Sequence, residues 1–297
     1  MAKIYVQNAK WGNTTLFRQT EHFSGKFKGH FFSPFRLSKY DWAILDGPPD
    51  DTAKSIPRAR RIHFLMENPI IWRPHPGFFE TVGVVVSPFD LGFPSHIHWI
   101  QQHPSIPWFY GIPFRTDAGM LHINSKSHVC LDKLLNKNVP KKNKTMSIIA
   151  SSKSATSGHQ WRFNVLQEVK KYFGCNVDIY GFGHRPISNK ETAIDRYFFS
   201  ICIENTSSEY YWSEKLSDVT LGYTTPIYSG ASKVQESFSD ELNTVDFHVD
   251  PKKFCNLVSK FIDKGPDNLK VLNRRRHESL CIHNIFAVVD NIIKYSG

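Results

Sequence analysis

The stretch "YFFSICIENTSSEYYWSEKLSDVTLGYTTPIYSGA", residues 197–231, decides the fold. It opens with an apolar run, 197–203, that predicts a buried strand, and it closes with a second strand at 224–229. The residues between them predict a helix from about Ser213 to Gly222. A strand, a helix and a second strand in this order form a right-handed unit with parallel strands. The sequence therefore predicts an α/β protein.

The same alternation continues on both sides of this stretch. Apolar residues of the segment 159–173 recur at the helical period, and Asp250 followed by Pro251 is typical of a helix start. The further elements that we expect in the second half are strands at 146–151 and 176–181, and helices at 159–173, from Pro251 onward and at 283–295.

The first half contains short β-rich runs and poorly marked helices. The runs are 3–7, 41–46, 61–66 and 81–86, mostly closed by Gly, Pro, Asn or Asp. Charge, Asn and Pro then replace apolar periodicity in "LLNKNVPKKNKT" (134–145), which predicts a linker. We therefore expect two α/β domains, residues 1–140 and 146–297.

Composition limits the classes of protein to consider. With 297 residues, 40% of them hydrophobic, the chain can form real cores. The five cysteines are scattered without a C-x-x-C pair, which favours neither a disulfide framework nor a zinc site. A net charge of +10 favours an anionic partner, which can be nucleic acid, an anionic membrane or nucleotide phosphates. The local basic clusters "KKNK" (141–144) and "NRRR" (273–276) are more simply explained as ordinary solvated surface.

Three loops follow predicted strands in the second half, at 151–160, 182–190 and 204–213. Parallel sheets bind phosphorylated ligands beyond the carboxyl ends of their strands, where helix N-termini present free N–H groups. Arg162 falls in the first turn of one such helix, where it can bind a diphosphate or simply be a solvated helix arginine.

Glu214 and Lys215 open the next helix. A lysine in the first turn is favourable when an anion is bound there, and a carboxylate can accept hydrogen bonds from both hydroxyls of a ribose. Glu214 can equally be a helix cap. Tyr210, Tyr211 and Trp212 can stack on a base or sugar, or be part of the core.

Taken together, residues 197–231 resemble the donor-binding signature of family 10 glycosyltransferases, the α1,3/4-fucosyltransferases. The resemblance implies a GT-B protein with two Rossmann-like domains, the second of which binds GDP-fucose in the cleft between them. Family members need no metal-binding D-x-D motif, and this sequence has none, so we expect no metal or other cofactor. The elements that carry the resemblance are Glu204-Asn205-Thr206, Tyr211-Trp212-Ser213-Glu214-Lys215 and Pro226-Ile227-Tyr228-Ser229-Gly230.

The resemblance also implies roles for single residues. Arg162 and Lys215 would neutralise the diphosphate, and Glu214 would hold the ribose hydroxyls. The other residues expected at the donor site are Asn205 and Tyr211, which would line the nucleotide-sugar pocket, Glu204 of the E-N motif, and Ser152, which stands where the family often has Asn.

Inverting transfer also needs a base for the acceptor hydroxyl. Glu67, in "RIHFLMENP" (61–69), follows a predicted strand and resembles the family's G-E-N or G-E-P segment, which implies that Glu67 is this base. The alternative interpretation is that Glu67 is a solvent-facing glutamate in a turn, without a catalytic role. Asp46 and His63 are lesser candidates. The three histidines of 95–103, His96, His98 and His103, fit an acceptor pocket or plain packing better than a metal site.

We therefore expect an inverting fucosyltransferase that uses GDP-fucose and an acceptor oligosaccharide, including a lipid-linked one. The expected location is cytoplasmic, with peripheral contact at an anionic inner-membrane surface, because no run of about 18 apolar residues is present. One alternative is a transferase of the same fold with another nucleotide sugar. The other is a non-catalytic nucleic-acid-binding protein, although we expect no nucleic-acid partner because no known binding motif of that class occurs.

Overall fold

The computed structural model of the chain describes residues 1–7, 12–35, 39–117, 120–123, 129–152 and 156–296. It contains two compact units. The first consists of residues 1–107, 130–133 and 281–297, and the second consists of residues 108–129 and 134–280. Each unit is built around its own main sheet.

The second unit has a five-stranded sheet in which every strand is parallel to its neighbours. The order is β11-β10-β12-β13-β14, so the chain moves outward from β10 on one side and from β12 on the other. This boundary between β10 and β12 is the topological switch point, where open α/β sheets bind ligands. The strands are β10 (Lys144–Ile149), β11 (Val177–Tyr180), β12 (Tyr197–Ile203), β13 (Thr225–Ser229) and β14 (Asn243–Thr244).

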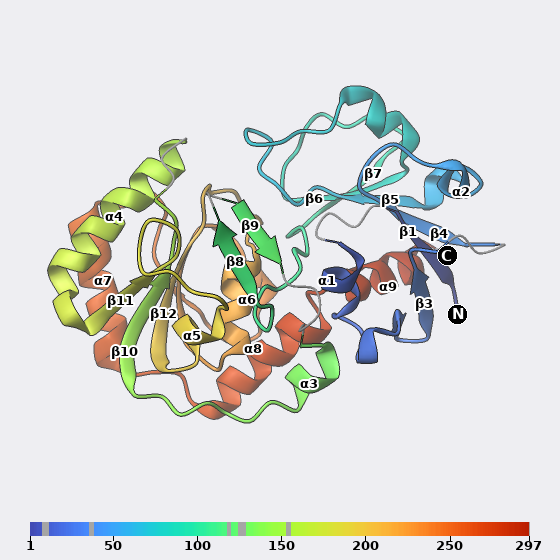
Figure 1. Cartoon of the computed structure of the whole chain (residues 1–297). Helices are drawn as coiled ribbons and strands as arrows, with labels where there is room; N and C mark the ends of the chain where they lie inside the picture. The colour runs from blue at the N-terminus through green and yellow to red at the C-terminus, as the bar shows by residue number, and fades with distance from the viewer. Residues whose placement is uncertain (8–11, 36–38, 118–119, 124–128, 153–155, 297) are drawn as a thin grey trace. The chain divides into compact units, whose positions relative to one another are not determined.

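One face of this sheet is covered by α4 (Ser157–Phe173) and α7 (Pro251–Lys264), which lie side by side in Figure 1. Because alternate strand residues point to the same face, the apolar ones meet both helices in a single buried cluster. Asp250 caps α7 as predicted, with its carboxylate accepting hydrogen bonds from the backbone N–H groups that follow. The cluster includes Met146, Ile148, Val165, Val169, Phe199, Ile201, Ile227, Phe254 and Val258.

The opposite face carries the short helix α5 (Glu191–Ile194) and α6 (Glu214–Leu221). The segment 108–114 packs against α6, where the Asp218 carboxylate accepts hydrogen bonds from the N–H groups of Phe109 and Tyr110 at 2.8 Å each. This segment leads into an antiparallel hairpin of β8 (Phe114–Asp117) and β9 (Met120–Ile123). The chain also contains α3 (Leu131–Leu135) and α8 (Leu269–Cys281).

The first unit has a seven-stranded sheet in the order β2-β3-β1-β4-β5-β6-β7. All neighbours are parallel except β2 and β3. Two short helices lie in its amino-terminal part, α1 (Asn13–Phe17) and α2 (Asp51–Lys54). The strands are β1 (Lys3–Gln7), β2 (Lys26–Phe27), β3 (His30–Ser33), β4 (Trp42–Leu45), β5 (Arg61–Phe64), β6 (Val84–Ser87) and β7 (His98–Gln101).

The last helix, α9 (Ile285–Tyr295), belongs to the first unit although it follows the second unit in sequence. The ring of Phe286, fully buried, packs edge-on against Phe32 with 4.6 Å between ring centroids. Asp290, also fully buried, lies 3.1 Å from the His30 ring nitrogen Nε2. These contacts attach α9 to β3.

The α/β class and the two Rossmann-like sheets are confirmed. The compact units do not follow the predicted division into 1–140 and 146–297, because the segment 108–129 packs with the second unit and α9 with the first. The interpretation of "NRRR" as solvated surface is wrong for two of its arginines. Arg275 and Arg276 are 1% and 5% exposed, and Arg275 forms an ion pair with Asp267. The location of an active site between the domains stays a prediction.

Candidate functional site

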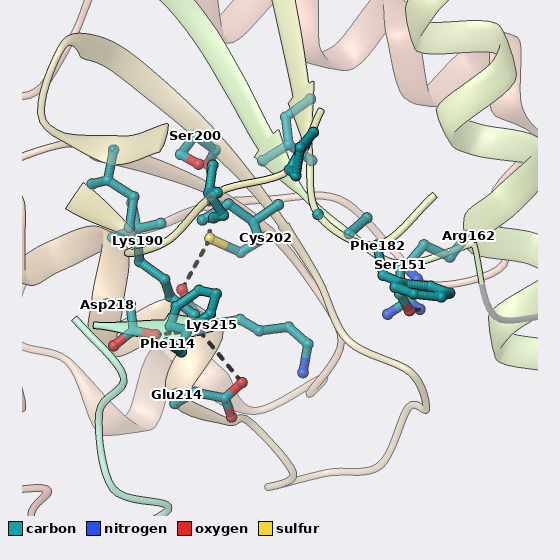
Figure 2. A pocket seen from close by; sticks show the side chains of 18 residues that line it. Phe114, Ser151, Arg162, Phe182, Lys190, Ser200, Cys202, Glu214, Lys215 and Asp218 are labelled. Carbon is teal, nitrogen blue, oxygen red and sulfur yellow. Dashed lines mark hydrogen bonds and ion pairs between the residues drawn. The ribbon is translucent and has the colours of Figure 1, made fainter. Parts of the chain in front are cut away.

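A cavity of about 230 Å³ lies in the second unit at the switch point of its sheet. Its walls come from the ends of β10, β11 and β12, from the loop before α5, and from the first turns of α6 (Figure 2). The charged side chains that line it are Arg162, Lys190, Glu214, Lys215 and Asp218. The cations outnumber the carboxylates by one on these walls, three against two.

Arg162 lies in the second turn of α4, which begins at Ser157, two residues earlier than predicted. Its side chain is not solvated, since the residue is 5% exposed. One guanidinium nitrogen, Nη2, lies 3.3 Å from the Ser151 hydroxyl, and Nε has no hydrogen-bond partner in the described part of the chain. Burial lowers the pKa of Arg162, and the nearby Glu204 carboxylate only partly offsets this. A buried cation with an unused donor is a strong anion-binding element.

Glu204 explains the position of Lys215. This carboxylate is fully buried and accepts hydrogen bonds from the Ser213 N–H at 2.8 Å and from the Lys215 ammonium at 2.9 Å. Ser213 caps α6, so its side chain links the helix start to the same carboxylate. Burial opposes the charge on Lys215, yet Glu204 and Glu214 outweigh it and raise the pKa of Lys215 above its usual value. Glu204, just after β12, therefore holds the charged ammonium of Lys215 at the cavity.

Glu214 follows the cap and points into the cavity. The Lys190 ammonium lies 3.7 Å from its carboxylate and also donates a hydrogen bond to Asp218. Burial alone would raise the pKa of Glu214, but Lys215 and Lys190 outweigh it and hold this pKa below its usual value. Glu214 is thus an ionised acceptor at the wall of the cavity.

The structure brings together three of the predicted donor residues, Arg162, Glu214 and Lys215. The alternative reading of Glu214 as the helix cap is not supported, because Ser213 has that role. Four other predicted donor residues do not line the cavity: Ser152, Glu204, Asn205 and Tyr211.

Three of these residues, Ser152, Glu204 and Tyr211, form contacts elsewhere in the second unit. Ser152 is exposed and its N–H donates to the Phe182 carbonyl, while its neighbour Ser151 lines the cavity. Glu204 acts on the cavity through Lys215. Tyr211 is 2% exposed, and its carbonyl accepts a hydrogen bond from the Tyr228 hydroxyl. The donor roles of Ser152, Asn205 and Tyr211 stay predictions.

The neighbouring aromatic residues pack rather than face the cavity. Trp212 is 3% exposed and lies 5.5 Å from the Phe238 ring. The Tyr210 hydroxyl donates to Glu236. An aromatic ring that does line the cavity is Phe182, which is 46% exposed and so has a free face for stacking.

The lining residues that were not identified from the sequence include Lys190, Asp218 and Phe182. Phe182 and Lys190 do lie in the loop 182–190, which the position after a strand had marked as a ligand-binding loop. Asp218 could have been found from its spacing, four residues after Glu214 on the same helix face.

The proposed base, Glu67, lies in the first unit just beyond β5. Its carboxylate accepts a hydrogen bond from the Asn68 N–H at 3.2 Å. Asp46 lines a separate small cavity of about 30 Å³ at the ends of β1 and β4. His63 is fully buried and bonds to the Leu45 carbonyl at 2.8 Å, so it is a core residue.

The histidines of 95–103 do not gather at one point. His98 is exposed on β7, and His96 bonds to the Phe79 carbonyl. His103 is 5% exposed and pairs with His283 at 3.2 Å; burial, and then His283, lower its pKa well below the usual range. Among the described residues, no set of three His, Cys, Asp or Glu side chains is arranged to hold a metal ion.

Residues 139–263 match the model of the carboxyl-terminal region of glycosyltransferase family 10 (fucosyltransferase). The alpha-(1,3)-fucosyltransferase FucT of Helicobacter pylori is 27% identical over 142 residues, which cover 48% of this chain and 27% of that protein. The match therefore spans about a quarter of that relative's length.

Similar solved structures include an alpha1,3-fucosyltransferase with GDP-fucose, at 18% identity and a TM-score of 0.48, covering 93% of this chain and 80% of that chain. The GtfA/B complex is 12% identical with a TM-score of 0.38, covering 74% of this chain and 46% of that chain. Within the described residues, no helix is both long and apolar enough to cross a bilayer.

Proposed function

Since residues 139–263 belong to glycosyltransferase family 10, the fucosyltransferases, we propose that this chain moves fucose from GDP-fucose to a hydroxyl of an acceptor glycan, with inversion at the anomeric carbon. The cavity at the switch point is the observation that best supports this. A buried guanidinium and a fixed ammonium, from Arg162 and Lys215, suit a diphosphate, and the Glu214 carboxylate suits ribose hydroxyls.

The proposed reaction is a single displacement. The acceptor oxygen attacks the anomeric carbon, the bond from that carbon to the diphosphate oxygen breaks, and the acceptor proton passes to the Glu67 carboxylate. Negative charge develops on the departing GDP, and Arg162 and Lys215 would stabilise it. Attack from the side opposite the leaving group inverts the configuration.

This scheme predicts GDP binding that needs no divalent metal, because protein cations take the place of one at the diphosphate. Isothermal titration calorimetry should give the same GDP affinity in EDTA as in Mg²⁺. A strict requirement for Mg²⁺ would contradict the scheme. Transfer assays with a panel of nucleotide sugars would separate GDP-fucose from the second candidate, a different sugar donor.

The structure gives little support to the nucleic-acid alternative, because two side chains of each basic cluster are engaged within the protein. Arg275 and Arg276 are buried, and the Lys142 ammonium bonds to the Gly222 carbonyl at 2.7 Å. The Lys144 ammonium pairs with Asp178 at 2.5 Å. These side chains are engaged within the protein rather than grouped on an open phosphate-binding surface.

For the acceptor, we propose a glycan joined to a lipid, at a membrane surface. An apolar turn follows the segment Glu67-Asn68-Pro69, and its residues Ile70, Ile71 and Trp72 are 81%, 48% and 44% exposed. Buried Asn68 fixes the turn, since its side-chain oxygen accepts from the Ile70 N–H at 2.9 Å. Contiguous exposed apolar side chains mark interaction sites, and Trp is typical of membrane interfaces.

Changing Trp72 to Ala should raise KM for a lipid-linked acceptor about tenfold and leave KM for the same free sugar nearly unchanged, because only the apolar contact is lost. Steady-state kinetics with both acceptors would measure this. Phe163→Ala is the matched control, since Phe163 is 39% exposed on α4. An equal effect of the Trp72 change on both acceptors would argue against a lipid contact at this turn.

A further inference from the structure

A lysine stands between two carboxylates of helix α6. Glu214 and Asp218 are four residues apart, so they lie on one helix face, one turn from each other. The Lys190 ammonium donates a hydrogen bond to Asp218 and lies 3.7 Å from Glu214. The exposed fractions of the Lys190, Glu214 and Asp218 side chains are 12%, 19% and 1%. Figure 2 shows all three among the side chains that line the cavity.

The two carboxylates differ in what they bind within the protein. Asp218 accepts hydrogen bonds from the Phe109 and Tyr110 N–H groups as well as from Lys190, so it is a fixed anchor for the ammonium. The distance from Lys190 to Glu214 is longer than a hydrogen bond. Lys190 therefore attracts the Glu214 carboxylate without occupying its acceptor positions.

Charge repulsion between the two carboxylates gives this ammonium a role beside that of Lys215. Two carboxylates one turn apart repel each other when both are ionised, and a cation close to both of them offsets this repulsion. The other nearby ammonium, of Lys215, is bonded to the Glu204 carboxylate and the Ser213 hydroxyl at 2.9 Å each. The Phe109 ring packs 5.3 Å from the Lys190 ammonium and limits where it can move.

We propose that Lys190 is a positioning residue that keeps Glu214 ionised and directed into the cavity, where Glu214 accepts hydrogen bonds from the ribose hydroxyls of the nucleotide. This inference rests on the proposed function. Lys190 acts through Glu214, and it thereby sets the preference of the site for a ribonucleotide over a deoxyribonucleotide.

Calorimetric titration with GDP and with 2′-deoxyguanosine diphosphate tests this. The wild-type protein should bind GDP at least about tenfold more tightly, because a charge-assisted hydrogen bond is lost with the 2′-hydroxyl. In Lys190→Met the preference should fall to about twofold or less, with GDP still held by Arg162 and Lys215. Lys190→Arg should restore the preference, since it keeps the charge. Lys171→Met, at an exposed position of α4, is the control for net charge.

A double-mutant cycle separates positioning from general damage. Glu214→Gln should remove the preference by itself, and adding Lys190→Met to it should remove nothing more. Should Lys190→Met fail to fold, Lys190→Gln gives the same readout. Wild-type protein without GDP affinity would overturn the proposed function. Wild-type protein that binds GDP with a ribose preference that survives Lys190→Met would overturn the positioning role alone.

Discussion

Burial of the Arg162 guanidinium is energetically unfavourable in the protein without ligand. A guanidinium that is 5% exposed loses hydration, and the structure shows no ion pair for it within the described residues. Its burial therefore makes sense as preparation for an anionic ligand. Replacing Arg162 by Met should weaken GDP binding by about 1–3 kcal/mol, the range for charge-assisted hydrogen bonds, while the free energy of unfolding stays equal or rises.

Calorimetry with GDP and denaturant unfolding would measure the two effects of Arg162→Met on the same preparation. The matched control is Arg196→Met, because Arg196 is exposed and bonds only weakly to Asn143, at 3.3 Å. A large loss of stability with unchanged GDP affinity would mean that Arg162 is a structural residue.

Single residues were predictable from the sequence where a regular element fixes them. Glu214 and Lys215 follow a strand, a loop and a helix cap, so their place at the edge of the sheet follows from the alternation. Lys190 lies in a loop without periodicity, and only the packing of this loop against α6 brings it to the cavity. The resemblance pointed to Ser152, whereas its neighbour Ser151 lines the cavity.

Helix α9 packs into the core of the first unit, although it follows the second unit in sequence. Its Phe286 ring is fully buried against Phe32, with Phe17 and Phe27 also within 6.2 Å between ring centroids. Phe286→Ala should therefore lower the stability of the first unit by about 3–5 kcal/mol, through lost burial and the cavity left behind.

Hydrogen exchange followed by mass spectrometry would locate the effect of Phe286→Ala. Amides of β1 and β3 should exchange faster, whereas those of β10 and β12 should change little, because they belong to the other unit. Tyr295→Ala, at 89% exposure on the same helix, is the control. Faster exchange confined to the second unit would be inconsistent with the packing described.

The helix itself was predictable, since its apolar period and polar flanks are local signals. The strand against which this helix packs was not predictable. Strand β3 (His30–Ser33) escaped notice because it is short and lies among aromatic and basic residues, and chain order gave no sign that α9 returns to it. Long-range pairing of this kind depends on complementary surfaces that exist only in the folded chain.

The proposed chemistry is divided between the two units. The lining of the cavity at the switch point belongs to the second unit, and the proposed base Glu67 belongs to the first. Binding of the nucleotide and removal of the acceptor proton should therefore be separable by mutation. The alternation of strands and helices predicted this division into two sheets, but it could not define how the chain passes between units.

Glu67→Gln tests the division most sharply, because the amide keeps the size of the side chain and cannot take a proton. We expect kcat for transfer to fall by at least about a hundredfold, the usual contribution of a general base. GDP affinity should stay within about twofold of wild type, since no cavity-lining residue is changed. Glu80→Gln, a carboxylate of the same unit that is 61% exposed, should behave as wild type. A loss of GDP affinity in Glu67→Gln would indicate that this residue contacts the nucleotide rather than the acceptor. Unchanged turnover would mean that another residue is the base.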